Sequence, residues 1–331
     1  MYVPVLKKIH TSINTLVERA LPVSGAIYVK PGVELRPFDK VGDCLFSHQM
    51  MPLPDKFKPK KKIVPGGREN FRRDSVVGHL ARERIIAPFD GDLVFDGEVY
   101  VFKEIEKKHS LLSGVWGTVS EVIPSMSVLI KTQVADIAFA LATPVVASGE
   151  MVIFPNPTEI LEEYYLESFL KNPLGKVVYI GNYVKEDVVE KAHKLGIGAA
   201  ICGSTTKKAF DYALKNKFGL GVISGYGKMQ VPSSVYNYLS KISYRQVFFE
   251  GERSILRVPI PLEEFMQNND KGCVLIKEVL PADKVQVFQK NYFGNIGTVD
   301  RVGENSIFVR FKTEDKSVIE ILSPNFFILQ D

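Results

Sequence analysis

Three short apolar runs, Val177-Val178-Tyr179-Ile180, Ala199-Ala200-Ile201-Cys202 and Leu220-Gly221-Val222-Ile223, decide how the middle of this sequence is expected to fold. Each run precedes a segment with the spacing of a helix, at 185–195, 205–217 and 233–241, and a fourth run follows at 245–249. Strands that alternate with helices of this length predict a parallel sheet with right-handed crossovers. We therefore expect an α/β module over residues 157–262, entered through an amphipathic linker helix at 158–171.

The composition is that of an ordinary globular protein, with 45% hydrophobic and 24% charged residues in a chain of 331. A prior of about 150 residues per domain suggests two or three domains. The formal net charge of +4 is small for this length. It argues against a protein that coats nucleic acid along its whole surface, but it leaves room for a local basic patch.

The cysteines and the N-terminus bear on the cellular location. Cys44, Cys202 and Cys273 lie far apart with no CxxC pair, so neither a zinc ribbon nor a disulfide framework is expected. Residues 1–20 lack the uninterrupted apolar core of a secretory signal. The longest apolar region, 134–154, is interrupted by Asp136, Pro144 and Glu150, which argues against a membrane span. These features predict a cytoplasmic protein without a membrane partner.

Residues 1–156 are predicted to form a β domain. The segments 87–94 and 112–122 place Gly, Pro and Asp around short apolar runs. They resemble the two half-motifs of biotinyl/lipoyl-type barrel-sandwich domains. That family often carries a modified lysine at a hairpin tip, and the corresponding residue would be Lys107. Lys107 lacks the flanking methionines of a biotin site, so we expect a scaffold without a swinging arm and no biotin or lipoyl adduct.

A basic insertion at 54–73 interrupts this β region. Its cations are Lys56, Lys58, Lys60, Lys61, Lys62, Arg68, Arg72 and Arg73. Pro59, Pro65, Gly66 and Gly67 exclude a continuous helix, so we expect a mobile, positively charged loop. Two interpretations remain open: a solvated insertion, or a contact to phosphates or an acidic partner. For the second, the candidate residues are Lys60, Lys61, Lys62, Arg72 and Arg73.

The C-terminal region, 280–331, returns to β structure with apolar residues at every second position. Residues 287–299, with Gly294, Gly297 and the following Thr298-Val299, resemble the KOW motif of the elongation factor NusG and several ribosomal proteins. The resemblance implies an SH3-like barrel and contact with nucleic acid or with a transcription or translation complex. Lys290, Tyr292, Phe293, Gly294 and Gly297 are the candidate contact residues.

The loops after the central strands form a second candidate site, because ligands of open parallel sheets bind beyond the carboxyl ends of the strands. The candidate residues for an anion or small ligand are Gly203, Ser204, Thr205, Gly225, Gly227 and Lys228. The same residue types are ordinary at helix N-caps and tight turns. Neither a GxGxxG nor a GxxxxGK[ST] pattern is present, so a scaffold without a ligand stays the alternative.

The sequence offers no catalytic constellation. The five histidines lack metal-binding spacings, and Ser224 lacks the GxSxG context of a hydrolase nucleophile. We therefore expect no enzymatic activity, no metal and no cofactor. The expected fold class is multidomain α+β, with an N-terminal barrel-sandwich-like domain, a central α/β parallel-sheet module and a C-terminal SH3-like barrel.

The expected function is that of a modular binding protein that contacts nucleic acid or a transcription or translation complex through its KOW-like domain. Two alternatives stay open. One is a self-assembling structural scaffold that holds a protein partner or a second copy, and the other is a small-ligand sensor or enzyme that uses the central module.

Overall fold

The computed structural model describes residues 1–47, 49–95, 97–154, 166, 172–267, 274–311 and 318–330. Contacts between residues divide the chain into two units. Unit 1 contains Met1–Thr15, Gly114–Gly117 and Thr132–Asp331, and unit 2 contains Leu16–Ser113 and Thr118–Lys131. These boundaries differ from the predicted regions 1–156, 157–262 and 280–331, because unit 1 joins the first strand and all residues from Thr132 onward.

The central sheet of unit 1 runs in the order β16-β21-β20-β18-β17-β22-β23-β15. Its strands are β15 (Ser127–Ala138, in unit 1 from Thr132 onward), β16 (Leu141–Ala142), β17 (Val146–Ile153), β18 (Val177–Tyr179), β20 (Ala199–Thr205), β21 (Gly219–Tyr226), β22 (Gln246–Glu250) and β23 (Ile255–Ile260). The short β19 (Tyr183–Val184) pairs with the end of β20. Pairing is parallel from β17 through β18 and β20 to β21, and antiparallel for β16, β22, β23 and β15.

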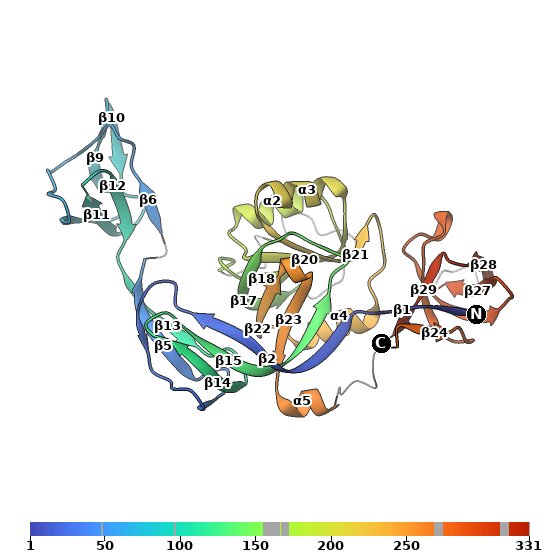
Figure 1. Cartoon of the computed structure of the whole chain (residues 1–331). Coiled ribbons are helices and arrows are strands. Elements are labelled where there is room, and N and C mark those ends of the chain that lie inside the picture. The colour runs from blue at the N-terminus through green and yellow to red at the C-terminus, as the bar shows by residue number, and fades with distance from the viewer. Residues whose placement is uncertain are drawn as a thin grey trace. The chain divides into compact units, whose positions relative to one another are not determined.

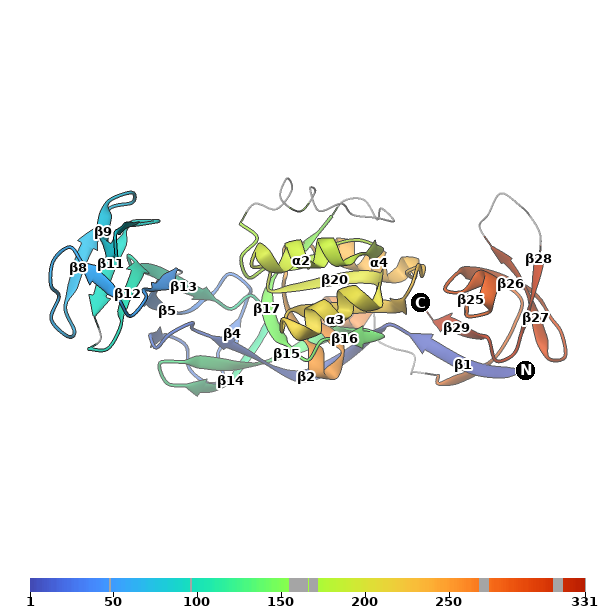
Figure 2. The ribbon, with the colours of Figure 1, turned by 90° about the horizontal axis from the view of Figure 1, so that it is seen from above.

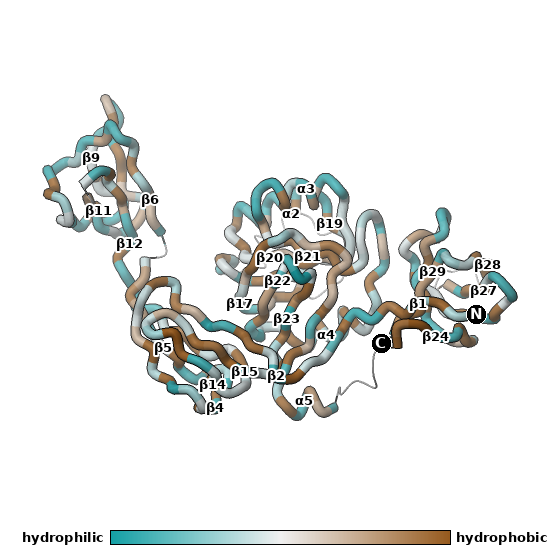
Figure 3. The backbone as a smooth tube through the Cα atoms, in the orientation of Figure 1, coloured by the Kyte–Doolittle hydropathy of each residue, from teal (hydrophilic) through white to brown (hydrophobic). Residues whose placement is uncertain are grey.

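Helices cover both faces of this sheet, which explains why its strands read as continuous apolar runs. Alternate residues of a strand point to opposite faces. Val178 lies in one core with Ala192, from α2 (Glu186–Lys194), and with residues of α3 (Lys207–Lys215). Val177 lies in the other core with Leu239, from α4 (Ser233–Lys241). Figures 1 and 2 show α2 and α3 side by side, and Figure 3 shows hydrophobic residues along β22 and β23.

The predicted fold class is wrong. The structure is mostly β, with 51% of residues in strands and 13% in helices, and it contains several sheets. The expected run of parallel strands is present, but it is not a separate parallel-sheet module. β17 pairs in parallel with β18 on one side and antiparallel with β22 on the other, so the sheet is mixed. The error arose because local alternation of strands and helices says nothing about which other strands join the same sheet.

A second sheet of unit 1, the C-terminal sheet, runs in the order β24-β1-β29-β25-β26-β27-β28. Its strands are β1 (Tyr2–Lys7), β24 (Ile276–Glu278), β25 (Lys284–Val287), β26 (Ile296–Val302), β27 (Ser306–Phe311), β28 (Val318–Leu322) and β29 (Phe326–Gln330). Figure 1 shows β1, in dark blue, among the orange and red strands. β1 pairs in parallel with β29, so the first residues of the chain complete a sheet expected from residues 280–331 alone.

Three short helices complete unit 1 in the described residues: η1 (Gly251–Arg253), α5 (Leu262–Gln267) and η2 (Lys290–Tyr292). The predicted linker helix at 158–171 lies outside the described residues except for Leu166, and Cys273 also lies outside them. Among the helices that the structure describes, none combines the length and hydropathy needed to cross a membrane.

Unit 2 is built from small sheets. β3 (Ala26–Ile27), β5 (Lys40–Phe46) and β13 (Lys107–Leu112) form one of them, and β14 (Gly117–Ile123, in unit 2 from Thr118) lies between β4 (Glu34–Leu35) and the first residues of β15. β2 (Ile9–Ala20, in unit 2 from Leu16) pairs with β15. Lys107 lies opposite Phe46 within the β5–β13 pair and binds Glu104 at 2.5 Å. It is therefore a paired strand residue, not the hairpin tip expected from the barrel-sandwich resemblance.

Between β5 and β13, the chain forms two further sheets around a core of its own. One is β6 (Met50–Pro52), β12 (Tyr100–Glu104), β11 (Gly91–Phe95) and β8 (Arg68–Phe71), in that order, and the other is β10 (Glu83–Ile86), β9 (Val76–Leu80) and β7 (Phe57–Pro59). Phe57, Ile63 and Phe71 are buried in this core. The segment 54–73, expected to be a mobile, positively charged loop, therefore contains two short strands, and apolar residues between its lysines anchor it in this core.

Candidate functional site

Tyr292 and Phe293, the aromatic pair of the KOW-like segment, point to different surroundings. The ring of Tyr292 stacks on that of Phe311 with centroids 5.1 Å apart, against the core of the C-terminal sheet. The side chain of Phe293 is 48% exposed. The two residues lie at the end of η2 rather than in a strand, so a helical turn, and not strand alternation, separates them.

The two glycines of the segment are buried, and neighbouring chain segments close over them. Gly294 has φ +78°, and a Cβ there would lie 2.6 Å from Met229 Cγ. The backbone N–H of Gln230 donates to Gly294 O at 3.0 Å. A Cβ on Gly297 would lie 2.3 Å from Val309 Cγ1. Both glycines therefore allow close packing within unit 1, and neither offers its backbone to a partner.

Gln230 and Gln286 hold this contact in place. Gln286 donates from Nε2 to Gln230 O at 3.1 Å and to Gly294 O at 3.2 Å. Gln230 Oε1 accepts from the backbone N–H of Ile296 at 3.0 Å. The loop that follows β21 thus satisfies the polar backbone atoms of the loop before β26. Because these hydrogen bonds occupy the backbone of Gly294, a partner of the KOW-like segment would contact its side chains.

Three phenylalanines form the exposed part of this region, which we call the phenylalanine surface. Phe288 makes edge-to-face contacts with Phe293, at 5.7 Å, and with Phe327, at 5.2 Å between ring centroids. Phe288 and Phe327 are half-buried. Lys290 is exposed nearby in the chain and has no ion pair with any described residue. An exposed ring with an exposed cation three residues earlier in the chain suits a partner with flat aromatic groups and negative charge.

Two of the hydroxyl residues in the strand-end loops of the central sheet, which the sequence suggested as an anion site, face the interior of the fold. Ser204 and Thr205 are both fully buried. Ser204 Oγ donates to Asn182 O at 3.0 Å, and Thr205 Oγ1 donates to Val184 O at 2.8 Å. A Cβ on Gly203 would lie 2.3 Å from Val231 Cγ2, so this glycine also serves close packing. The hydrogen-bonding capacity of the loop is used within the fold.

The remaining residues of these loops are also placed by the fold. Thr206, and not Ser204 or Thr205, caps α3 by accepting from the backbone N–H of Ala209 at 3.1 Å. Gly225 and Gly227 have φ values of +132° and +85°, which favour glycine. The Lys228 ammonium lies 6.0 Å from the centroid of the Tyr183 ring. These contacts support a structural role for the loops.

In unit 2 the predicted cations lie at the surface. Lys60, Lys61, Lys62, Arg72 and Arg73 are all exposed. Lys61 binds Glu69 Oε1 at 3.3 Å, and Arg73 donates its backbone N–H to Asp90 at 2.7 Å. Apart from Lys61, the side chains of this set have no ion pair with any described residue.

A different set of basic residues is brought together by strand register. Lys58 of β7 lies directly opposite His79 of β9, and His79 lies directly opposite Arg84 of β10. All three are exposed, and none has an ion pair within the described part of the chain. We call them the basic row. Sequence reasoning missed His79 and Arg84 because only the pairing of β7, β9 and β10 places them beside Lys58.

The buried Arg257 of unit 1 is paired with two carboxylates, which indicates a structural role. The side chain of Arg257 is 8% exposed and binds Asp136 at 3.0 Å and Glu250 at 2.5 Å. With both carboxylates engaged by one guanidinium, this group offers no free acid or base for catalysis. No group of His, Cys, Asp and Glu that could hold a metal occurs among the described residues.

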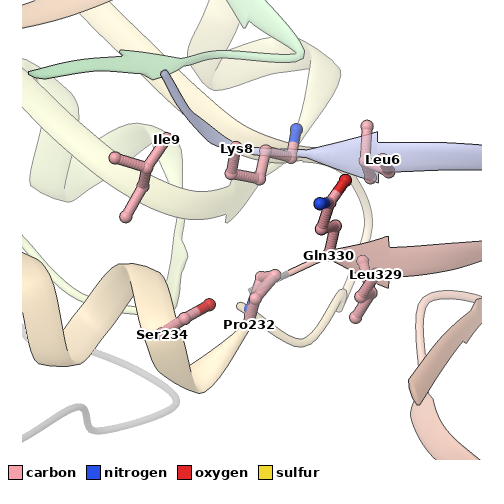
Figure 4. A pocket seen from close by; sticks show the side chains of 7 residues that line it. All are labelled: Leu6, Lys8, Ile9, Pro232, Ser234, Leu329 and Gln330. Atoms are coloured by element: carbon pink, nitrogen blue, oxygen red, sulfur yellow. The ribbon is translucent and has the colours of Figure 1, made fainter. Parts of the chain in front are cut away.

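A small pocket lies where β1 and β29 meet the start of α4 (Figure 4). It is lined by Leu6, Lys8, Ile9, Pro232, Ser234, Leu329 and Gln330. Its cavity volume of about 20 Å³ fits a water molecule rather than an organic ligand. Lys8 donates from Nζ to Ile223 O at 2.7 Å, and burial lowers the pKa of Lys8 to about 8. The pocket thus belongs to the joint between two sheets and is too small for the ligand site of a sensor.

Comparison with known proteins assigns the chain to no family. No protein-family model matches the sequence, and no curated protein matches it.

Proposed function

We propose that this chain is a non-enzymatic modular binding protein that contacts nucleic acid through the phenylalanine surface of its C-terminal sheet. One observation carries the proposal: Phe293 is 48% exposed on a cluster of aromatic rings, three residues after Lys290, which is exposed and has no ion pair with any described residue. A partner that covers this ring removes its apolar surface from water, and this burial favours binding.

The chemistry of the surface favours a single strand of nucleic acid. Every base has a flat face that stacks on a phenyl ring, and a stacked base contributes about 1–3 kcal/mol. Lys290 supplies a positive charge for the adjacent phosphate. Because stacking is tolerant of sequence, binding to a single strand is expected with little sequence preference.

The test is binding of a short single-stranded RNA to the full chain and to the Phe293→Ala variant. Loss of one stacked base should weaken binding about tenfold, since about 1.4 kcal/mol corresponds to a factor of ten. Phe38→Ala is the matched control, because Phe38 is an 87% exposed ring in unit 2, outside the phenylalanine surface. RNA binding that is equal for the wild type and Phe293→Ala, at an unchanged melting temperature, would overturn the proposal.

The same two variants, Phe293→Ala and Phe38→Ala, distinguish nucleic-acid binding from the scaffold alternative. If Phe293 instead contacts a second copy of the chain, Phe293→Ala should change the mass measured by light scattering and leave RNA binding unchanged. That outcome would replace nucleic-acid binding by self-assembly as the role of this surface.

A further inference from the structure

The basic row of unit 2 has a geometry that suits a chain of phosphates. Lys58, His79 and Arg84 occupy directly opposite positions on the neighbouring strands β7, β9 and β10. Neighbouring strands lie about 4.8 Å apart, so the backbones of Lys58 and Arg84 are separated by about 10 Å. Two long cationic side chains at this separation can reach two different phosphate groups, with the imidazole of His79 between them.

Lys58 and Arg84 lie on the two edge strands of this sheet, and among the described residues each has only His79 directly opposite it. The obvious acidic neighbours do not neutralise the row. Glu83 lies opposite Leu80, one register position from His79, so strand alternation directs it to the other face. Glu69 is engaged by Lys61. The three exposed basic side chains therefore keep their capacity to donate to an external anion.

We propose that the basic row binds the phosphate backbone of duplex nucleic acid. The inference extends the proposed function, from which it takes nucleic acid as the partner, but it concerns a different surface in a different unit. Lysine and arginine contacts to phosphates contribute affinity without reading sequence. Bases in a duplex are already stacked, so binding of a duplex does not require the phenylalanine surface.

The test compares two double variants in binding a short DNA duplex over a range of salt concentrations. Lys58→Ala/Arg84→Ala removes the ends of the basic row. Lys40→Ala/Lys107→Ala is the matched control, because it removes the same charge at two exposed lysines of unit 2 that have ion-pair partners in Asp43 and Glu104. The wild type is expected to bind with a salt dependence that reports several phosphate contacts.

The row variant should bind the duplex about 10- to 100-fold more weakly at moderate salt, and the slope of log K against log salt should be shallower by about 1.8 for two lost contacts. The control should lie within about threefold of the wild type, since its lysines are engaged by carboxylates. The melting temperature of the row variant should stay nearly the same, because both substituted side chains are exposed. A folded row variant that binds the duplex as the wild type does would overturn the inference.

Two further measurements keep this inference separate from the proposed function. Phe293→Ala should bind the duplex as the wild type does, whatever its effect on single-stranded RNA. A chain whose basic row is required for binding an acidic polypeptide such as polyglutamate, but which does not bind duplex DNA, would overturn the assignment of nucleic acid as the partner of the row.

Discussion

The loop before β26, which contains Gly294, and the basic row of unit 2 carry residue types that are typical of binding sites, but their surroundings differ. Gly294 is closed over by Met229 and Gln230. Lys58 and Arg84 are exposed, and their charges have no ion pair among the described residues. This difference shows that a residue type indicates binding only where the fold leaves its polar groups without partners or its apolar surface exposed.

Gly294→Ala tests the buried loop of this pair and is expected to have the largest effect. The variant forces a Cβ to within 2.6 Å of Met229 Cγ at a φ of +78°. Backbone strain and overpacking together should lower the free energy of unfolding by about 4 kcal/mol. Gly227→Ala is the matched control, because Gly227 has φ +85° with no atom within 4 Å of an added Cβ. That control should cost only about 1 kcal/mol. Equal losses in denaturant unfolding would mean that the contact with Met229 yields easily.

Lys8 offers a cation that the fold does bury, in contrast to the basic row. Its pKa is lowered from 10.5 to about 8 by burial. Between these values the unfolded chain binds more protons than the folded chain, so Lys8 makes stability rise as pH increases through this window. Below it, the buried charge costs about 3 kcal/mol.

Lys8→Met should remove this dependence on pH. The stability of the variant relative to the wild type should fall by about 3 kcal/mol between pH 7 and pH 10.5, as the wild-type lysine becomes neutral. Urea unfolding of both proteins at several pH values measures it. Lys228→Met, at an exposed lysine, serves as the control and should show a constant difference. A constant difference for Lys8→Met as well would contradict the buried-charge account.

Tyr292→Ala and Phe293→Ala separate core from surface within one dipeptide. Tyr292→Ala loses the stack on Phe311 and its burial, and should cost about 2 kcal/mol of unfolding free energy. Phe293→Ala should stay within about 0.5 kcal/mol, because the ring is largely exposed. Thermal unfolding measures both. If both variants lose stability equally, Phe293 is structural and the phenylalanine surface is not free for a partner.

The smallest effect on stability is expected for the triple variant Lys60→Ala/Lys61→Ala/Lys62→Ala. All three lysines are exposed, so the free energy of unfolding should change by about 0.5 kcal/mol or less. If these lysines also contact phosphates, nucleic-acid binding should weaken for all sequences alike, with a salt slope shallower by about 0.9 per lost contact. Unchanged affinity would mean that Lys60, Lys61 and Lys62 are solvated and that the phosphate contacts of unit 2 belong to the basic row.

The sequence determined the local elements well in the central region. The helix expected at 233–241 coincides with α4, and the apolar runs that begin at Val177 and Ala199 form β18 and β20. The reason is that short-range spacing of apolar residues fixes helix or strand without reference to distant residues. The same spacing could not reveal that β17 joins parallel and antiparallel neighbours, which made the predicted fold class wrong.

The tertiary structure alone decided which residues meet. The pairing of β1 with β29 joins the two ends of the chain, and the register of β7, β9 and β10 places Lys58, His79 and Arg84 in one row. Likewise, only the contact with Met229 shows that Gly294 is a packing residue. Pairing, register and burial depend on contacts between residues far apart in the sequence, and local propensity carries no information about them.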